Sequence, residues 1–303
     1  MAKTNILLES GTNEMEIMKF TICDELYGIN VAKVREIMIA DKIKPVPRSH
    51  PMVEGIFKPR DVLLTIVDLP RYLTGESQYP EGKELLMVTS FNQMDIAFRV
   101  HSVVGIQRIS WADIKKPDKT LNNGEEGIAT GIAESNGELV VILDFEKIVA
   151  EIAPETSIDL NEVEEVSVPG REIPKIILAE DSEFLAKLIQ VALTKAGYTN
   201  FVRYNNAYEA WKYLQSYENN QSLKEHASLI ITDIEMPEMD GHRLTRLVKE
   251  HKILNKIPII IFSSLINEEM EIKGRQLGAD TQLSKPEIGL LVESIDVLLQ
   301  KWE

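Results

Sequence analysis

Five polar side chains in the second half of the sequence follow short apolar runs, and their types suit the binding of a cation and a phosphate. They are Glu180, Asp181, Asp233, Ser263 and Lys285. Short apolar runs separated by helix-period stretches are typical of buried parallel strands. Ligands of such sheets bind outside the carboxyl ends of the strands. We therefore expect one sheet edge to gather three carboxylates, a hydroxyl and an ammonium group.

Three neighbouring carboxylates repel one another unless a cation lies among them. Two unit charges ~4 Å apart cost about 4 kcal/mol at an effective dielectric constant of about 20, and Mg²⁺ with oxygen ligands removes this cost. The ion also lets a carboxylate approach a phosphoryl group. Asp233 would then act as a nucleophile and form an acyl phosphate, while Lys285 and Ser263 contact the transferred oxygens.

Each of these residues also has a purely structural interpretation. An acidic pair after a strand often begins a helix, a serine there is usually a cap, and Lys285-Pro286 could form a simple turn. All five in order, each at a strand end, seldom occur together by chance. The conjunction therefore favours a functional site.

The elements around these residues alternate between strands and helices. Ser182 is a suitable N-cap and Gly197 a suitable stop, and the apolar stripe between them predicts a buried helix face of Phe184, Leu188, Val191 and Ala192. A second stripe, which we interpret as core packing, is Ala207, Ala210, Trp211 and Leu214. Further helices are expected over 241–251, 268–277 and 287–302. Five strands alternating with five helices predict a doubly wound α/β domain with a parallel sheet.

The first half of the chain is β-rich. The runs 18–22 and 26–30 flank Cys23-Asp24-Glu25, as in a hairpin. Further strands are expected over 62–67, 85–89, 95–100 and 139–143, and one short helix over 31–39. Many short strands punctuated by Gly and Pro predict small barrels or a sandwich.

Composition limits the class of protein. The chain has 303 residues, enough for two domains, and a formal net charge of −15. This charge argues against binding of nucleic acid or anionic membrane surfaces. No apolar run reaches the ~18 residues that span a bilayer, the first residues lack a secretory signal pattern, and the single cysteine, Cys23, allows no internal disulfide. These features predict a cytoplasmic protein without direct membrane insertion.

An acidic stretch separates the two halves. The residues from Glu151 to Gly170 include no Lys or Arg, and Pro154 and Pro169 lie near its ends. Such composition is typical of a solvated linker. We expect one domain over 1–152, a linker over 153–172 and a second domain over 173–303.

The second half resembles the receiver domain of two-component signalling proteins. The match runs from Ile176 to Trp302 and is carried by the acidic pair, by DIEMPEMDG from Asp233, by the hydroxyl in IPIIIFSS and by the lysine in LSKP. The resemblance implies that Asp233 accepts a phosphoryl group from a histidine kinase. It also implies Mg²⁺ ligands from Asp181, Asp233, the backbone carbonyl of Glu235 and, through water, Glu180. Ser263 and Lys285 would reorganise around the phosphoryl group.

Two positions of this half bear on how such a receiver would work. Many receivers carry a rotating Tyr or Phe as a switch residue where this chain has Gln282. Glu235, two residues beyond the acceptor, lies where receivers control access of water. We expect it to influence the lifetime of the acyl phosphate.

The first half resembles the CheW coupling domain, a pair of small β-barrels. The similarity lies in the segment from Tyr27 to Leu73 and in GIAESNGELVVILDFEKI near the end of the domain. It implies that partners bind at Val34, Glu36, Gly55 and Arg60. The turn Lys58-Pro59-Arg60-Asp61 replaces the usual Asn-Leu-Arg-Gly.

Together these resemblances are those of the CheV type, a CheW-receiver fusion of bacterial chemotaxis. They imply a cytoplasmic adaptor at chemoreceptor arrays that couples methyl-accepting chemoreceptors to the histidine kinase CheA. Phosphorylation of Asp233 would modulate the coupling, and the protein would not be an enzyme beyond hydrolysing its own acyl phosphate. Two alternatives are a phosphate sink for the kinase and a haloacid-dehalogenase-like phosphatase, in which Glu235 would stand in place of the usual second Asp.

Overall fold

The computed structural model describes residues 13–39, 42–59, 62–77, 85–91, 94–117, 127–135, 137–153, 163, 174–216, 223–285 and 287–302. The chain forms two compact units. One consists mainly of Met15–Ile109 and Asp113–Thr156, and the other mainly of Ser157–Glu303. Each has its own hydrophobic core.

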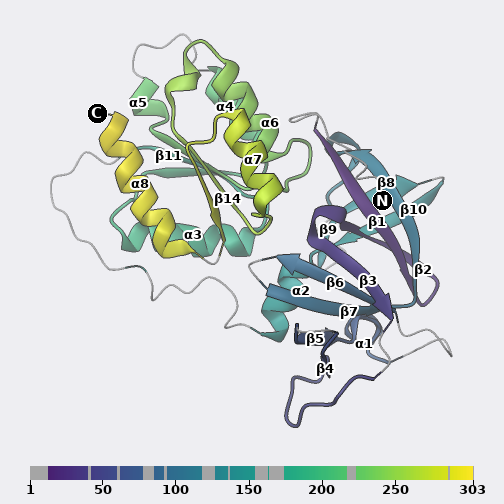
Figure 1. Ribbon diagram of the computed structural model, residues 1–303. Coiled ribbons are helices and arrows are strands. Elements are labelled where there is room, and N and C mark those ends of the chain that lie inside the picture. The colour runs from purple at the N-terminus through teal and green to yellow at the C-terminus, as the bar shows by residue number, and fades with distance from the viewer. Residues whose placement is uncertain are drawn as a thin grey trace. The chain divides into compact units, whose positions relative to one another are not determined.

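The C-terminal unit is built on a parallel sheet, as the sequence predicts (Figure 1). Its strands lie in the order β12-β11-β13-β14-β15. Their bounds are β11 (Ile176–Ala179), β12 (Phe201–Tyr204), β13 (Leu229–Thr232), β14 (Ile259–Ser263) and β15 (Thr281–Ser284). All four pairings between neighbours are parallel, so the carboxyl ends of the strands share one edge.

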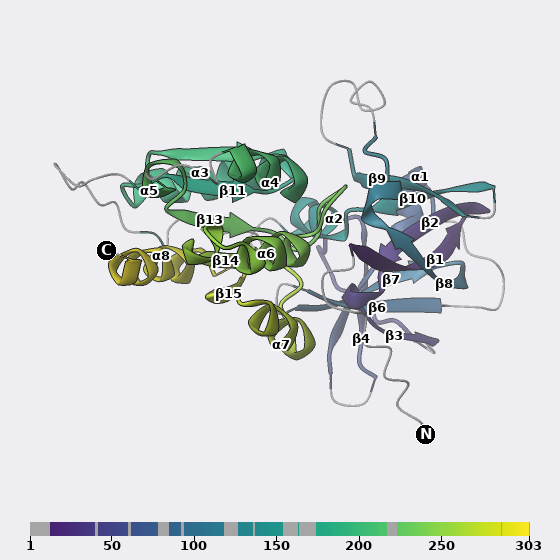
Figure 2. The same cartoon turned by 90° about the horizontal axis from the view of Figure 1, so that it is seen from above.

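Helices cover both faces of this sheet (Figure 2). Alternate strand residues point to opposite faces. Ile176 and Leu178 pack against α3 (Glu183–Lys195) and α8 (Ile288–Trp302). Ile177 and Ala179 instead pack on the face of α4 (Ala207–Ser216) and α6 (Gly241–Glu250). The remaining helices of the unit are α5 (Leu223–His226), α7 (Glu268–Leu277) and the 3₁₀ turn η6 (Leu254–Lys256).

Side-chain caps explain where three of these helices begin. Ser182 accepts a hydrogen bond from the Leu185 amide, as the sequence predicts. Asp240 and Asn267 do the same for α6 and α7. Each cap satisfies a backbone amide that has no partner within its helix. The caps thus hold the turns that lead from β11, β13 and β14 into the next helix.

The predicted buried face of α3 is partly wrong. Phe184 and Val191 are 49% and 50% exposed, whereas Ala186, Ile189 and Leu193 are buried together with Ala192. The buried stripe of α3 is thus displaced from the predicted one, and its members share one core with Ile176 and Leu178 of the sheet. The second stripe is confirmed, because Ala207, Ala210 and Leu214 are buried and Trp211 packs against the same core.

The N-terminal unit contains two five-stranded sheets, with the orders β8-β1-β2-β10-β9 and β3-β6-β7-β5-β4. The first comprises β1 (Glu14–Ile22), β2 (Glu25–Asn30), β8 (Ser102–Ser110), β9 (Ala129–Ser135) and β10 (Glu138–Leu143). The second comprises β3 (Val34–Ile39), β4 (Val53–Phe57), β5 (Leu64–Val67), β6 (Leu85–Phe91) and β7 (Met94–Val100). The strands predicted from apolar runs are all present, and the β-rich fold class is confirmed.

A helix helps to fill the core that the two sheets share. In α2 (Phe145–Ile152), the Phe145 ring meets Phe98 of one sheet and Phe20 of the other edge-on, with centroids 4.8 and 6.2 Å away. Such edge-to-face pairs favour aromatic cores. The other helical elements described in the first half are α1 (Leu69–Thr74) and the 3₁₀ turns η1 (Val31–Lys33) and η2 (Trp111–Asp113).

Two local predictions for this unit have different outcomes. The hairpin is confirmed, with Cys23 and Asp24 both at positive φ in a two-residue turn that suits the strand twist. The single helix expected over 31–39 is wrong: after η1 the chain continues as β3, which pairs with β6. The β-branched residues of this segment gain more from that pairing than from a short isolated helix.

Most of the expected linker, and also Arg60, lie outside the described residues. Val163 is described and is buried in the core of the C-terminal unit. Among the described helices, none combines the length and apolarity needed to cross a bilayer.

Candidate functional site

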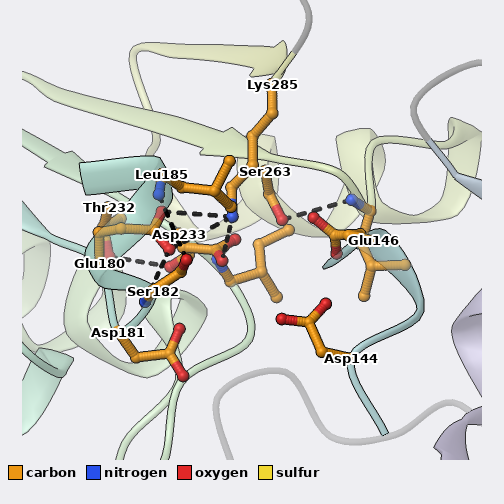
Figure 3. Close-up of polar contacts among 12 residues, drawn as sticks. Asp144, Glu146, Glu180, Asp181, Ser182, Leu185, Thr232, Asp233, Ser263 and Lys285 are labelled. Atoms are coloured by element: carbon orange, nitrogen blue, oxygen red, sulfur yellow. Dashed lines mark hydrogen bonds and ion pairs between the residues drawn. The ribbon is translucent and has the colours of Figure 1, made fainter. Parts of the chain in front are cut away.

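An ammonium group and two carboxylates meet at the carboxyl edge of the parallel sheet. Lys285 Nζ lies 2.7 Å from Asp233 Oδ2 and 3.2 Å from Glu180 Oε2. These three residues come directly after β15, β13 and β11, and they are 3%, 5% and 1% exposed. Figure 3 shows their side chains converging. Charge-assisted contacts of this kind are strong when water is excluded.

Asp181 completes an acidic cluster and is its most exposed member. Glu180, Asp181 and Asp233 each place one carboxylate oxygen within 4.8 Å of the others. Asp181 is only partly buried, whereas the other two are buried. The ligand set is entirely oxygen, which suits a hard ion such as Mg²⁺ that keeps several waters. These residues therefore fit a magnesium ion.

The surroundings of Glu180 favour added positive charge. Burial raises the pKa of the Glu180 carboxyl well above its usual value. The Lys285 ammonium opposes this rise, while the carboxylates of Asp233 and Asp181 add to it. A divalent cation among the carboxylates acts in the same direction as Lys285, because it stabilises the ionised form.

Backbone groups hold the two buried carboxylates. The Ile234 amide donates to Asp233 Oδ1 at 2.6 Å, and the Ser182 amide donates to Glu180 Oε1 at 3.2 Å. Each acid is therefore fixed by its own turn as well as by Lys285. Fixed rotamers keep the cluster in one geometry.

The turn after β13 is packed tightly against the start of α6. Thr232 Oγ1 donates to the Asp233 carbonyl at 2.9 Å, and a Cβ on Gly241 would lie 1.8 Å from that same oxygen. Only glycine fits there, since any side chain would displace the Asp233 backbone. The Gly241 amide also donates to the Ile234 carbonyl at 3.0 Å, which closes the turn.

The other predicted receiver residues lie at or beside this edge. Ser263 ends β14 and is fully buried, and its Oγ accepts a hydrogen bond from the Leu265 amide at 3.3 Å. Glu235 follows two residues after Asp233 and is partly exposed. Gln282 lies in β15 and turns toward α7, where its Nε2 donates to the Glu271 carbonyl at 2.8 Å and its Oε1 abuts Gly274.

The predicted partner-binding residues of the first half lie on two strands. Val34 and Glu36 are in β3, where Glu36 is exposed and Val34 partly buried. Gly55 is buried in β4, and a Cβ there would lie 2.3 Å from the Lys44 carbonyl oxygen. β3 and β4 are the two edge strands of one sheet, and the segment that follows β3 bridges to β4 through Lys44 and Ile56.

Sequence reasoning missed two residues that shape the acidic site. Gly241 contacts the Asp233 backbone, and Arg203 in β12 donates to the carbonyls of Glu180 and Asp181. The glycine next to Asp240 was a usable signal, because it follows an N-cap residue. A lone arginine within a strand gives no comparable signal.

Comparison with protein families agrees with the division of the chain into two units. The model of the CheW-like domain matches residues 16–153, and that of the response regulator receiver domain matches residues 176–296. The two matches together span most of both units.

Individual relatives show the same arrangement. The chain is 27% identical over 304 residues to the chemotaxis protein CheV3 of Helicobacter pylori, covering 95% of this chain and 96% of the relative. Its first half is 26% identical over 145 residues to the chemotaxis protein CheW of Thermotoga maritima, covering 48% of this chain and 94% of the relative. Among solved structures, the phosphorylated cyanobacterial phytochrome response regulator RcpA is 25% identical, with a TM-score of 0.37, covering 43% of this chain and 95% of RcpA.

Proposed function

Because this chain is a CheV-type protein, a CheW-like domain joined to a receiver domain, we propose that it couples chemoreceptors to the histidine kinase CheA and that phosphorylation of Asp233 modulates the coupling. The chain thereby acts as a signalling adaptor in the cytoplasm, at chemoreceptor arrays. The observation that carries the receiver half is the meeting of three carboxylates and the Lys285 ammonium at one sheet edge.

In this proposal Asp233 is the phosphorylation site. Its carboxylate attacks the phosphorus of a phosphohistidine; the P–N bond breaks, the histidine nitrogen takes up a proton, and an acyl phosphate forms. Asp181, Asp233 and the Glu235 carbonyl would hold Mg²⁺, and Glu180 would act through water. When bound, the ion neutralises charge that would otherwise keep the phosphoryl group away from the carboxylates.

Lys285 and Ser263 are assigned to the product. In the unphosphorylated protein Lys285 Nζ bonds directly to Asp233. After transfer the ammonium moves to a phosphoryl oxygen, and the Ser263 hydroxyl donates to another. Because Ser263 Oγ accepts a hydrogen bond from the Leu265 amide, a rotation of this hydroxyl would link the site to the loop after β14. Gln282, held against α7, takes the place of an aromatic switch residue.

The coupling half rests on the CheW-like match. We assign partner contacts to Val34, Glu36, Gly55 and Arg60, and the domain bounds to 1–152 and 173–303 with a linker over 153–172. Of the described positions among these four, Glu36 is exposed on the edge strand β3, which supports its assignment to a partner contact. A phosphoryl group shifts such an adaptor only through interactions that differ between its two states.

The test is phosphotransfer from phosphorylated CheA to the full-length protein in the presence of Mg²⁺, with Asp233→Asn as the variant. We expect acid-labile label on the wild type and none on Asp233→Asn. Asp113→Asn, an exposed aspartate outside the receiver, is the matched control and should label normally. Label retained by Asp233→Asn would exclude the assigned acceptor.

A second readout separates an adaptor from a phosphate sink. Receptor-controlled CheA activity is measured with wild type and with Asp233→Asn in reconstituted arrays. If phosphorylation modulates coupling, receptors still control CheA activity with Asp233→Asn, but phosphorylating conditions no longer change that control. If the protein is a sink, receptor control of CheA is the same with wild type and Asp233→Asn, and other receivers stay phosphorylated for longer with the variant.

A further inference from the structure

Arg203 forms two hydrogen bonds with the turn that carries two of the three acidic side chains. From β12, its Nε donates to the Glu180 carbonyl and its Nη2 donates to the Asp181 carbonyl, both at 3.2 Å. The guanidinium thus spans two consecutive peptide groups. A planar fork of donors is suited to such a two-point contact.

These two carbonyls lie just past the paired part of β11. The register with β12 ends at Ala179 and Tyr204, and one further hydrogen bond joins the Glu180 amide to the Tyr204 carbonyl at 3.1 Å. Beyond this bond α3 begins at Glu183, where the Leu185 amide donates to the Ser182 side chain. Arg203 contributes two side-chain donors to the carbonyls of this turn.

We propose that Arg203 is a positioning residue for the metal site: by holding the carbonyls of Glu180 and Asp181, it fixes the direction in which their carboxylates leave the chain. This inference rests on the proposed magnesium-dependent function of the receiver. Groups that orient metal ligands from behind commonly change metal affinity by about tenfold or more when removed.

A positioning role and a purely electrostatic role of Arg203 predict opposite effects of its removal on Mg²⁺ affinity. A guanidinium near the acidic cluster repels a second cation, so charge alone predicts that its removal strengthens Mg²⁺ binding. If Arg203 acts through position, its removal weakens binding. Lysine at this position keeps the charge but lacks the fork, so it separates the two effects.

The experiment measures Mg²⁺ affinity of the full-length protein by titration calorimetry, together with thermal unfolding of each variant. The variants are Arg203→Gln and Arg203→Lys. Arg246→Gln is the matched control, because Arg246 is a receiver arginine whose exposed pair with Glu250 lies on α6. We expect Arg203→Gln to bind Mg²⁺ about tenfold more weakly, Arg203→Lys to be intermediate or equally weak, and Arg246→Gln to match the wild type.

Three outcomes would overturn the inference. Equal or tighter Mg²⁺ binding by Arg203→Gln would show that position does not matter. Wild-type affinity in Arg203→Lys would show that the two-point contact of the guanidinium is not needed. A lower unfolding temperature with unchanged affinity would reduce Arg203 to a structural role. The proposed function fails separately, if the wild-type protein itself binds no Mg²⁺.

Discussion

The Lys285 ammonium and the Asp233 carboxylate form a direct ion pair, 2.7 Å apart, with both side chains almost completely removed from water. Lys285 also reaches Glu180. Lys285 therefore compensates the two buried carboxylates of the cluster. Breaking a buried pair by removing one partner leaves uncompensated charge, which is far more costly than loss of an exposed pair.

Lys285→Met should therefore be destabilised in the presence of a chelator and should recover when Mg²⁺ is added. We expect a loss of about 3–5 kcal/mol in the free energy of unfolding without metal, with recovery by mass action as the ion binds. Denaturant unfolding at several Mg²⁺ concentrations measures both. Lys33→Met is the matched control, because Lys33 makes a largely buried pair with Glu146 at 2.8 Å in the other unit. The stability that Lys33→Met loses should not be restored by Mg²⁺. If Mg²⁺ also fails to restore the stability of Lys285→Met, the prediction is wrong.

Gly274 and Gln282 should show strong coupling in a double-mutant cycle. A Cβ on Gly274 would lie 2.1 Å from Gln282 Oε1, so Gly274→Ala must displace the amide and break its bond to the Glu271 carbonyl. In a Gln282→Ala background the obstacle is gone, and alanine gains its usual helix advantage of about 1 kcal/mol over glycine. Gly274→Ala should thus destabilise the wild type but stabilise Gln282→Ala, as measured by denaturant unfolding. Equal effects in both backgrounds would show that the two residues do not interact.

Gly55→Ala should destabilise the N-terminal unit more than Gly105→Ala. The two glycines have similar φ angles, 158° and 151°, so the backbone cost of alanine is shared. At Gly55 a Cβ would meet the Lys44 carbonyl at 2.3 Å, whereas at Gly105 no atom lies within 4 Å. We expect an additional loss of about 1–3 kcal/mol at Gly55, visible in urea unfolding. Equal losses would mean that residue 44 moves aside freely.

His242 should make the receiver less stable as the solution becomes acidic. Burial lowers the pKa of His242 to about 3, and Lys273 acts in the same direction. The unfolded chain, with its ordinary histidine pKa near 6.5, then binds more protons than the folded chain between about pH 6.5 and pH 3. Stability falls with decreasing pH throughout that window.

The comparison variant for this effect is His242→Leu. Nε2 of His242 is buried and has no hydrogen-bond partner among the described residues, so an apolar side chain leaves no lost bond at that atom. Between pH 7 and pH 5 the wild type should lose roughly 2 kcal/mol more than His242→Leu, as measured by urea unfolding. If the free energy of unfolding depends on pH in the same way in both proteins, the folded receiver accommodates a protonated His242, and the prediction is wrong.

The sequence was sufficient to predict the parallel sheet and the cluster at its edge. Apolar strands place whatever follows them at one edge, so Asp233, Ser263 and Lys285 could be located before any coordinates were known. Periodicity alone was less reliable for the face of α3. Phe184 and Val191 continue the apolar spacing, yet the buried residues are Ala186, Ile189, Ala192 and Leu193. Apolar side chains occur on more than one face of this helix, so their spacing alone does not decide which face meets the sheet.

Contacts made by single side chains across the chain were beyond reach of pattern analysis. Arg203 and Glu180 are brought together only by the pairing of β11 with β12, and no local pattern around Arg203 reveals its target. The prediction of a helix over 31–39 was wrong for a related reason. The short apolar spacing of this segment fits either a helix or a strand, and the partner strand β6, more than forty residues later in the chain, decides between them.

Lys285 is also the last residue of the site to be made by the ribosome. While β15 and α8 are still unsynthesised, a nascent receiver carries its acidic residues without their ammonium partner, and the core residues Ile288, Leu291 and Ile295 are missing as well. The same short stretch thus completes both the hydrophobic core and the charge balance of the acidic cluster. A receiver cut short before β15 would lack both.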